Sequence, residues 1–241
     1  MQFQIASDLH IEQYSSKDSM ASEFIQPSAD VLILAGDVGS MYRRRQLTNF
    51  LEDVCNKFQW VIYVPGNHEY YSIKSIPTIP MSRFQNFMKK LCAQITNLIF
   101  LDREVIEIDN IRVIGATLWS KISIEPRIVR IPCMNQNRYN GYHRRDLAFL
   151  RKEIKAAKWA KKKILVVTHH PPIEFFSSTD KYHELYSNSL EELMEDVNVW
   201  IYGHTHKNST RIIGKTQVIS NQKGKIRDNV NDYKKNCLIR I

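Results

Sequence analysis

Five short polar motifs are spread along the 241-residue sequence, and they carry residue types that bind metal ions. Eight of their side chains, two Asp, one Asn and five His, offer oxygen and imidazole ligands that suit Mn, Fe or Zn. Eight ligands exceed the four that one zinc ion takes. They suit two ions about 3.5–4 Å apart that share a carboxylate, with one histidine left for proton transfer. The motifs are Asp8-x-His10, Gly36-Asp37, Gly66-Asn67-His68-Glu69, His169-His170 and Gly203-His204-x-His206.

The spacing within two motifs predicts that each directs two ligands into one pocket. Residues i and i+2 of an extended segment point to the same side. Asp8 with His10, and His204 with His206, have that spacing. The glycines beside the motifs allow sharp turns and a close approach of the backbone to the ions.

Each motif follows a segment that reads as a strand, so the ligands are expected at the ends of strands. These strands are predicted at Gln2–Ala6, Val31–Ala35, Trp60–Val64, 164–167 and 197–202. Helical periodicity predicts helices at 42–58, 84–91, 143–162 and 190–194, with Leu147, Leu150, Ile154 and Trp159 facing inward from the third. Further strands are expected at 100–108 and 111–115, joined by an Asp109-Asn110 turn, and at Thr210–Ile213, Thr216–Ser220 and 237–241. Residues 116–142 have no clear period and are predicted to form a loop.

The alternation of strands and helices predicts an α/β fold. Ligands of such sheets gather beyond the carboxyl ends of the strands, where all five motifs are placed. At 241 residues, with 43% apolar and 24% charged residues, the chain is predicted to form one globular domain spanning 1–241.

The five motifs, in this order, resemble those of the calcineurin-like metallophosphoesterase superfamily, with matching positions from residue 8 to residue 206. The resemblance implies a two-sheet β-sandwich flanked by helices and a dinuclear metal centre. The implied ligands of one ion are Asp8, His10, Asp37 and His206. Those of the second are Asp37, Asn67, His169 and His204. Asp37 would then bridge the ions, and His68 would face the leaving group without binding metal.

The implied reaction is attack of a metal-bridged hydroxide on phosphorus, with His68 stabilising or protonating the departing oxygen. The cofactors expected are two divalent ions, with Mn²⁺ favoured and Fe, Zn, Ni or Mg as alternatives. Glu69 and His170 are interpreted as structural neighbours of the ligands.

Departures from the general pattern point to one branch of the superfamily. The residues after Asp37 lack the Asp-Arg-Gly of the Ser/Thr protein phosphatases. The chain is similar to a group of small, mostly uncharacterised phosphohydrolases of bacteria and some viruses, on the residues 116–119, 134–135, Arg138, 186–188 and Asn221. Candidate substrate-binding residues are Arg43, Trp119, Asn135, Arg138, Tyr186 and Asn188.

Charge and composition limit the partners. The 34 Lys and Arg residues outnumber the 25 acidic residues, which favours an anionic partner. No apolar stretch is long enough for a bilayer and no secretory signal is apparent, so no membrane partner is expected. The four cysteines form no CxxC pair, which favours a reduced, cytoplasmic setting. The basic residues between 151 and 163 are interpreted as a solvated helix face.

The function predicted from the sequence is hydrolysis of a phosphate ester, with a phosphodiester of a nucleotide or small organic phosphate favoured. A nuclease acting on polymeric nucleic acid and a phosphomonoesterase remain alternatives. A metal-free interaction scaffold is least favoured, because all eight positions of the motif set are filled.

Overall fold

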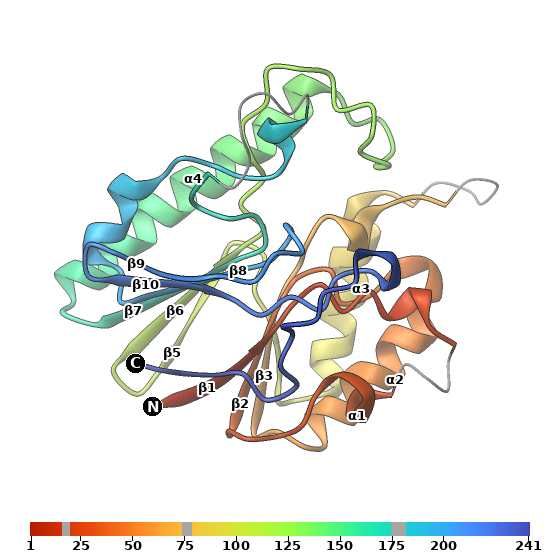
Figure 1. Cartoon of the computed structure of the whole chain (residues 1–241), viewed down its shortest axis with the longest axis horizontal. Helices are drawn as coiled ribbons and strands as arrows, with labels where there is room; N and C mark the ends of the chain where they lie inside the picture. Colours follow the sequence, from red (N-terminus) through yellow and green to blue (C-terminus); the bar gives the residue numbers. More distant parts are fainter. Residues whose placement is uncertain (16–19, 74–78, 175–181) are drawn as a thin grey trace.

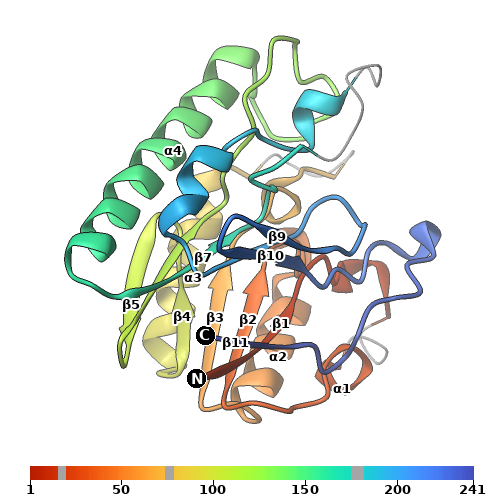
Figure 2. The ribbon, with the colours of Figure 1, turned by 60° about the vertical axis from the view of Figure 1, so that its left-hand side comes forward.

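Two β-sheets lie face to face between two layers of helices in the computed structural model (Figures 1 and 2). The structure describes residues 1–15, 20–73, 79–174 and 182–241. One sheet has the strand order β11-β1-β2-β3-β4, and the other has the order β5-β6-β7-β8-β10-β9. Helices α1, α2 and α3 cover the first sheet and α4 covers the second (Figure 1).

The strands of the first sheet are β1 (Gln2–Ala6), β2 (Val31–Ala35), β3 (Trp60–Val64), β4 (Leu98–Phe100) and β11 (Leu238–Arg240). Those of the second are β5 (Glu104–Ile108), β6 (Ile111–Ala116), β7 (Lys163–Thr168), β8 (Val199–Tyr202), β9 (Thr210–Ile213) and β10 (Thr216–Ser220). The α-helices are α1 (Ala21–Phe24), α2 (Arg44–Cys55), α3 (Met81–Gln94) and α4 (Gln136–Trp159). Short 3₁₀ helices are η1 (Ile11–Gln13), η2 (Met41–Arg43), η3 (His68–Tyr70), η4 (His183–Leu185), η5 (Glu191–Asp196) and η6 (Ile226–Asp228).

Alternation along the strands builds three apolar layers. In β2, Ile33 packs between the two sheets while Leu32 and Leu34 pack against the helices of the first sheet. In β7, Leu165 faces the other sheet and Val166 faces α4. Because both faces of these strands are covered, their sequences are continuous apolar runs.

The parallel strands bring the motifs together. Strands β1, β2 and β3 run parallel in one sheet, and β6, β7 and β8 run parallel in the other. The carboxyl ends of parallel neighbours lie at one edge of their sheet, and the motifs follow these ends. The α/β two-sheet fold predicted from the sequence is confirmed.

Three local predictions were wrong. Residues 100–108 were predicted as one strand, but β4 ends at Phe100 in the first sheet and β5 begins at Glu104 in the second. Helix α4 begins at Gln136, inside the predicted loop, because Asn135 caps it by accepting a hydrogen bond from the Arg138 N–H at 2.9 Å. Trp159 is 88% exposed instead of facing inward, because it lies about two and a half turns after the buried Leu150 and so is on the opposite face of α4.

Candidate metal centre

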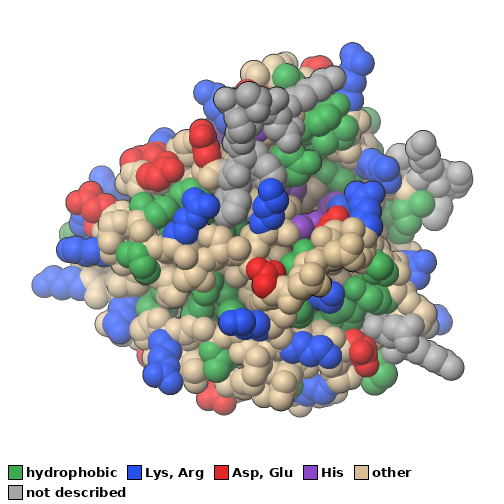
Figure 3. All heavy atoms as spheres, viewed as in Figure 1, with side chains coloured by type: hydrophobic (Ala, Val, Ile, Leu, Met, Phe, Trp, Pro, Cys, Tyr) green, Lys and Arg blue, Asp and Glu red, His purple; other side chains and the backbone are tan. Residues whose placement is uncertain are grey.

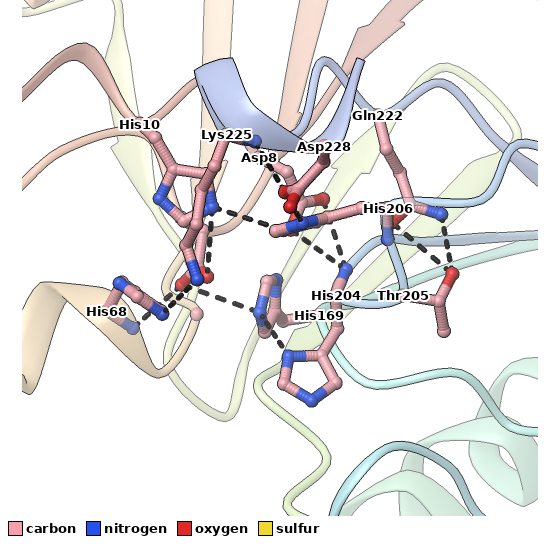
Figure 4. A network of polar contacts seen from close by, with 12 residues as sticks. Asp8, His10, His68, His169, His204, Thr205, His206, Gln222, Lys225 and Asp228 are labelled. Carbon is pink, nitrogen blue, oxygen red and sulfur yellow. Dashed lines mark hydrogen bonds and ion pairs between the residues drawn. The ribbon is translucent and has the colours of Figure 1, made fainter. Parts of the chain in front are cut away.

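The side chains of the five motifs converge at one edge of the two sheets (Figure 4). Asp8 and His10 follow β1, Asp37 follows β2, His169 follows β7, and His204 follows β8. In the described part of the chain, three groups of His, Asp or Glu side chains have ligand atoms within 4.8 Å of one another. Two of these groups contain only predicted ligands.

The first group comprises Asp8, His10 and His206. The Nε2 atoms of His10 and His206 lie 3.2 Å apart, and His206 Nε2 lies 3.3 Å from Asp8 Oδ1. These atoms could coordinate a single ion, since each is a ligand type that binds first-row transition metals.

The second group comprises Asp37, His169 and His204, with Asn67 beside them. His169 Nε2 lies 3.2 Å from His204 Nδ1 and 2.9 Å from Asn67 Oδ1. Tyr71 orients that amide, because its hydroxyl accepts a hydrogen bond from Asn67 Nδ2 at 2.7 Å. The amide oxygen is thereby directed toward the ring nitrogens.

Asp37 lies between the two groups. Its Oδ1 is 3.4 Å from His169 Nε2 and its Oδ2 is 3.8 Å from His10 Nε2. One carboxylate therefore offers one oxygen to each group, as a ligand shared by two ions would.

The four histidines of the two groups share one orientation, which tests whether a metal fits. Each has its inner nitrogen in the cluster and its outer nitrogen beside an oxygen that can only accept. The acceptors are Glu12 Oε1 for His10 (3.3 Å), Ala35 O for His169 (3.0 Å), Leu185 O for His204 (3.0 Å) and Asp228 Oδ2 for His206 (2.5 Å). A proton on each outer nitrogen leaves the inner lone pair free, which is how protein groups hold histidine ligands to metal ions. The residues present therefore fit divalent cations.

The backbone of the motifs is held in a sparsely populated conformation. Five of the seven predicted metal ligands have positive φ, namely Asp8 (54°), His10 (46°), Asp37 (52°), His204 (76°) and His206 (53°). Residues other than glycine rarely adopt positive φ, and those that do cluster at functional sites. The ligand pairs therefore reach the pocket through left-handed turns, and not through the extended alternation predicted from their spacing.

Two of the three motif glycines lie against the carboxylates of the cluster. A Cβ at Gly66 would overlap the Asp37 carboxylate and backbone, and one at Gly203 would overlap Asp8 Oδ2. Any larger residue would displace a carboxylate of the cluster.

The two buried carboxylates are anions in spite of their burial. Burial disfavours the charged form of Asp8, but the hydrogen bond from His206 and the charges of His169 and His206 lower its pKa to about 2. Burial likewise opposes ionisation of Asp37, whereas nearby His169 and His68 hold the pKa of this carboxyl well below its usual value. The pocket therefore carries negative charge that a cation can neutralise.

The histidines of the cluster differ in the direction of their pKa shifts. Burial lowers the pKa of His204 to about 3. For His169 burial acts in the same direction, but the charge and hydrogen bond of Asp37 outweigh it and raise the pKa to about 9. Asp37 thus favours positive charge at the position between itself, Asn67 and His204.

Glu69 joins the two loops that carry Asp37 and Asn67. It is fully buried and accepts hydrogen bonds from the Val38 and Gly66 N–H groups at 2.8 and 2.9 Å and from the Tyr63 hydroxyl at 2.6 Å. Burial, with the charge of Asp37, raises its pKa to about 8. Glu69 accordingly lies behind the cluster as a support for both loops.

His68 lies beside the two groups. Its ring packs edge-on against His10 at 4.7 Å and stacks on Tyr71 at 4.3 Å. Its backbone N–H donates to Asp37 Oδ1 at 2.7 Å. Burial lowers the pKa of His68 well below its usual value. The third candidate group joins His68 with His10 and Glu12, a combination the sequence did not suggest.

A cavity of about 970 Å³ opens over the cluster. Histidine side chains show at its base, between Lys and Arg side chains and apolar surface (Figure 3). Its lining includes Asp37, Asn67, His68, His204 and His206. This volume is within the range of small-molecule sites, about 300–1,000 Å³.

Of the six predicted substrate-binding residues, Tyr186 lines this cavity, with its ring 5.7 Å from that of His204. Trp119 is instead a core residue, 1% exposed and packed edge-on against Tyr139. Asn188 is buried and donates to the Pro171 carbonyl at 3.3 Å.

The other three candidates also lie outside the lining. Asn135 caps α4, and Arg138 donates to the Cys133 carbonyl at 3.1 Å. Arg43 is exposed at the start of α2.

Sequence reasoning missed the residues that orient the ligands from outside the motifs. Glu12 and Asp228 accept from the outer nitrogens of His10 and His206, and Lys225 Nζ lies 3.1 Å from His68 Nε2. Lys225 and Asp228 follow the last motif by about twenty residues, with no spacing that connects them to it. Only Glu12 could have been suggested by the sequence, because it is two residues after the predicted ligand His10.

The model of the calcineurin-like phosphoesterase family matches residues 1–208. The chain therefore belongs to this family, and the resemblance inferred from the motifs is confirmed. A protein of Acanthamoeba polyphaga mimivirus, Uncharacterized protein L509, is 26% identical over 268 residues, which cover 94% of this chain and 93% of that protein.

Two solved structures share the fold. Phosphopantetheinyl hydrolase from Mycobacterium tuberculosis has a TM-score of 0.76 at 19% identity, covering 100% of this chain and 95% of its own. The protein TT1561 of Thermus thermophilus has a TM-score of 0.57 at 12% identity, covering 92% of this chain and 88% of its own. The family supports a hydrolase of phosphate esters that binds divalent metal ions. Among the described residues, no helix has the length and apolar character needed to cross a membrane.

Proposed function

We propose that the chain is a dinuclear metal-dependent phosphoesterase, and that its substrate is a phosphodiester of a nucleotide or a small organic phosphate. One observation carries this proposal. The two oxygens of Asp37 face two sets of ring nitrogens, and the outer nitrogen of every ring in those sets is beside an acceptor oxygen. Such an arrangement suits two divalent cations about 4 Å apart.

The proposed ligands of the first ion are Asp8, His10, Asp37 and His206. Those of the second are Asp37, Asn67, His169 and His204. Two divalent ions, with Mn²⁺ favoured, would lower the pKa of water at the site and offset the charge of the phosphoryl oxygens.

Residues that do not bind metal would orient the ligands, assist the leaving group and contact the substrate. Tyr71 and the acceptors behind the histidines hold the ligands in place before substrate arrives, so binding requires little rearrangement. His68 is on the cavity side of the cluster, where its ring can stabilise or protonate the departing oxygen. Tyr186 offers an aromatic surface to the organic part of the substrate.

A substrate panel tests the proposal. Protein stripped with a chelator and reconstituted with Mn²⁺ is assayed on bis(4-nitrophenyl) phosphate, 4-nitrophenyl phosphate, cyclic nucleotides and single-stranded DNA. We expect metal-dependent hydrolysis that is fastest on a diester. Preference for the monoester would overturn the diester assignment. Preference for DNA, with steep salt dependence, would favour the nuclease alternative.

Measurement of the metal content is the second test of the proposed function. We expect two equivalents per chain after reconstitution by elemental analysis. The variant Glu125→Ala is a suitable control, because Glu125 is exposed and outside the cavity lining. A single equivalent, or no hydrolysis of any ester with both sites filled, would refute the proposal.

A further inference from the structure

The segment after β10 crosses the mouth of the cavity. Residues 221–235, here called the C-terminal strap, lie beyond the part of the chain that the family model matches. Lys225, Ile226, Arg227 and Asp228 of this strap line the cavity together with motif residues. The strap is therefore an addition to the site that the five motifs do not contain.

Three amide side chains fix the strap in place. Asn221 donates to the carbonyls of Ile5 and Lys234, both at 2.8 Å. Gln222 accepts from the His206 N–H at 2.6 Å. Asn208 accepts from the Gln222 N–H at 2.6 Å and donates to its carbonyl at 3.2 Å. Because these bonds connect the strap to β1 and to the last motif, its side chains have defined positions relative to the metal ligands.

The turn that follows directs Lys225 inward. Gly224 has φ of 71°, and a Cβ there would meet Val230 and His206. Asp228 then accepts from the Lys225 N–H at 2.9 Å and from His206 at the same oxygen. The backbone at Lys225 is thus held by the carboxylate that also orients a ligand.

Lys225 extends from the strap to His68 (Figure 4). Its Nζ is 3.1 Å from His68 Nε2, so the ammonium donates to the ring. In the part of the chain that the structure describes, no carboxylate forms an ion pair with Nζ. The residue is only partly exposed, and its charge faces the cavity.

Three further cations line the same cavity, Arg130, Lys207 and Arg227, and all three are exposed. The metal ligands and His68 are sufficient for the phosphoryl group being cleaved. Four cations beyond them, Lys225 included, match additional negative charge, since Lys and Arg recognise phosphate and carboxylate groups. Tyr71, Tyr186 and Ile226 supply the adjoining aromatic and apolar lining.

We propose that Lys225 is a specificity-determining residue that binds an anionic group carried by the leaving group. The preferred substrates would be phosphate esters whose leaving group bears a phosphate or carboxylate of its own. This inference rests on the proposed phosphoesterase function and on the position of His68 beside the leaving oxygen.

A matched pair of esters tests the inference. Phenyl 4-nitrophenyl phosphate and its analogue with a carboxylate next to the nitro group differ in the charge of the leaving group. We measure the ratio of kcat/KM for the charged ester to that for the neutral one, with metal content and Tm recorded for each variant. Losing one charge-assisted hydrogen bond reduces this ratio by about 10- to 100-fold in Lys225→Met.

Companion variants separate charge recognition from structure. Lys225→Arg keeps the cation and should retain most of the ratio. Lys225→Glu should lower the ratio further, because it places like charge beside the leaving group. Lys223→Met is the matched control, since Lys223 is on the same strap but outside the cavity lining, and it should leave the ratio unchanged.

The outcomes distinguish this inference from the proposed function. If the wild type hydrolyses both esters and Lys225→Met lowers both rates equally, Lys225 only supports His68 and the inference is wrong while the function stands. If the metal-loaded wild type hydrolyses neither these esters nor the broader panel, the proposed function fails first. A selective loss on a phosphorylated ester but not on the carboxylated one would restrict the recognised group to phosphate.

Discussion

The cavity and the outer face of α4 both concentrate charged side chains, but those beneath the cavity are buried and those on α4 are exposed to solvent. Beneath the cavity, Asp8 and His10 are completely buried, and their partners include neighbouring ligands and Glu12. On α4, Arg151 pairs with Glu192 at 3.2 Å with both side chains 55% exposed. Exposed pairs of this kind contribute about 1 kcal/mol or less, because water screens them.

The difference shows what makes a charged cluster functional. Burying the charged residues of the cluster costs free energy that another interaction must offset. The shared orientation of the four histidine rings indicates that a bound cation offsets it. The residues of this face need no ligand, since Lys158 of α4 already pairs with Asp196 at 2.7 Å and Lys162, in the turn after α4, pairs with Glu107 at 3.0 Å. Both regions are rich in charged residues, so residue type alone does not tell them apart. Burial is what distinguishes the candidate metal site from the solvated helix face.

The largest effect is expected from Asp37→Ala. Because one carboxylate faces both ligand groups, its removal should empty both metal sites and abolish turnover. Elemental analysis after dialysis against Mn²⁺ measures the loss, with Glu125→Ala as the control. One site remaining fully occupied would contradict the bridging role.

His68→Asn should retain both metals and lose activity. General acid catalysis contributes about 10²–10⁴-fold, and the loss should depend on the leaving group. An alkyl or nucleotide ester, whose leaving oxygen needs the proton, should lose more than a nitrophenyl ester. Equal losses with full metal content would leave positioning or charge stabilisation as the role of His68. Loss of metal would instead place His68 among the ligands.

Asp228→Asn should have an intermediate effect on the metal centre. Removing the carboxylate behind His206 weakens the orientation of this ligand, and such changes typically cost about 10- to 100-fold in metal affinity. Competition with a chromogenic chelator measures the affinity. Asp232→Asn is the control on the same strap, and an identical affinity in both variants would show that Asp228 does not support the ligand.

Asp146→Asn tests a buried charge on the inner face of α4. Burial raises the pKa of Asp146 to about 6, against the opposing influence of Arg103, whose guanidinium is 2.7 Å away. The Asp146 carboxyl therefore keeps its proton to a higher pH in the folded state than in the unfolded chain, where its pKa is about 3.8. The contribution to stability is complete below that pH and is lost as pH rises to about 6.

The free energy of unfolding of the wild type relative to Asp146→Asn should therefore fall by about 3 kcal/mol between pH 3.5 and pH 7. Urea titrations of chelator-treated protein at the two pH values provide the comparison. Parallel pH dependence of the two proteins would show that Asp146 ionises normally in the fold.

The smallest effect is expected on the outer face of α4. Lys155→Glu on α4, with Lys161→Glu in the turn after it, reverses two charges without breaking the ion pairs of Lys158 and Lys162. Turnover of a small ester should remain within about threefold of the wild type, because α4 covers the side of the second sheet that faces away from the first. A large loss on that substrate would show that this face communicates with the cavity.

The sequence by itself determined the five motifs and most of the strands that precede them. Strands β1, β2 and β3 coincide with their predicted bounds. β2 and β3 are continuous apolar runs, and the three strands end abruptly at Ser7, Gly36 and Pro65. The order of the motifs determined the family. These signals are local or sequential, so no contact between distant segments was needed to recognise them.

Only the tertiary structure decided which residues surround the cluster. Helix α4 begins where the sequence has no apolar period, because a cap and the packing of Tyr139 define its first turn. Trp119 and Asn188 became core residues, whereas Lys225 and Asp228 reached the site through a strap positioned by hydrogen bonds to β1 and the last motif. A side chain's neighbours depend on how separate segments pack, and a linear sequence carries no spacing that encodes such contacts.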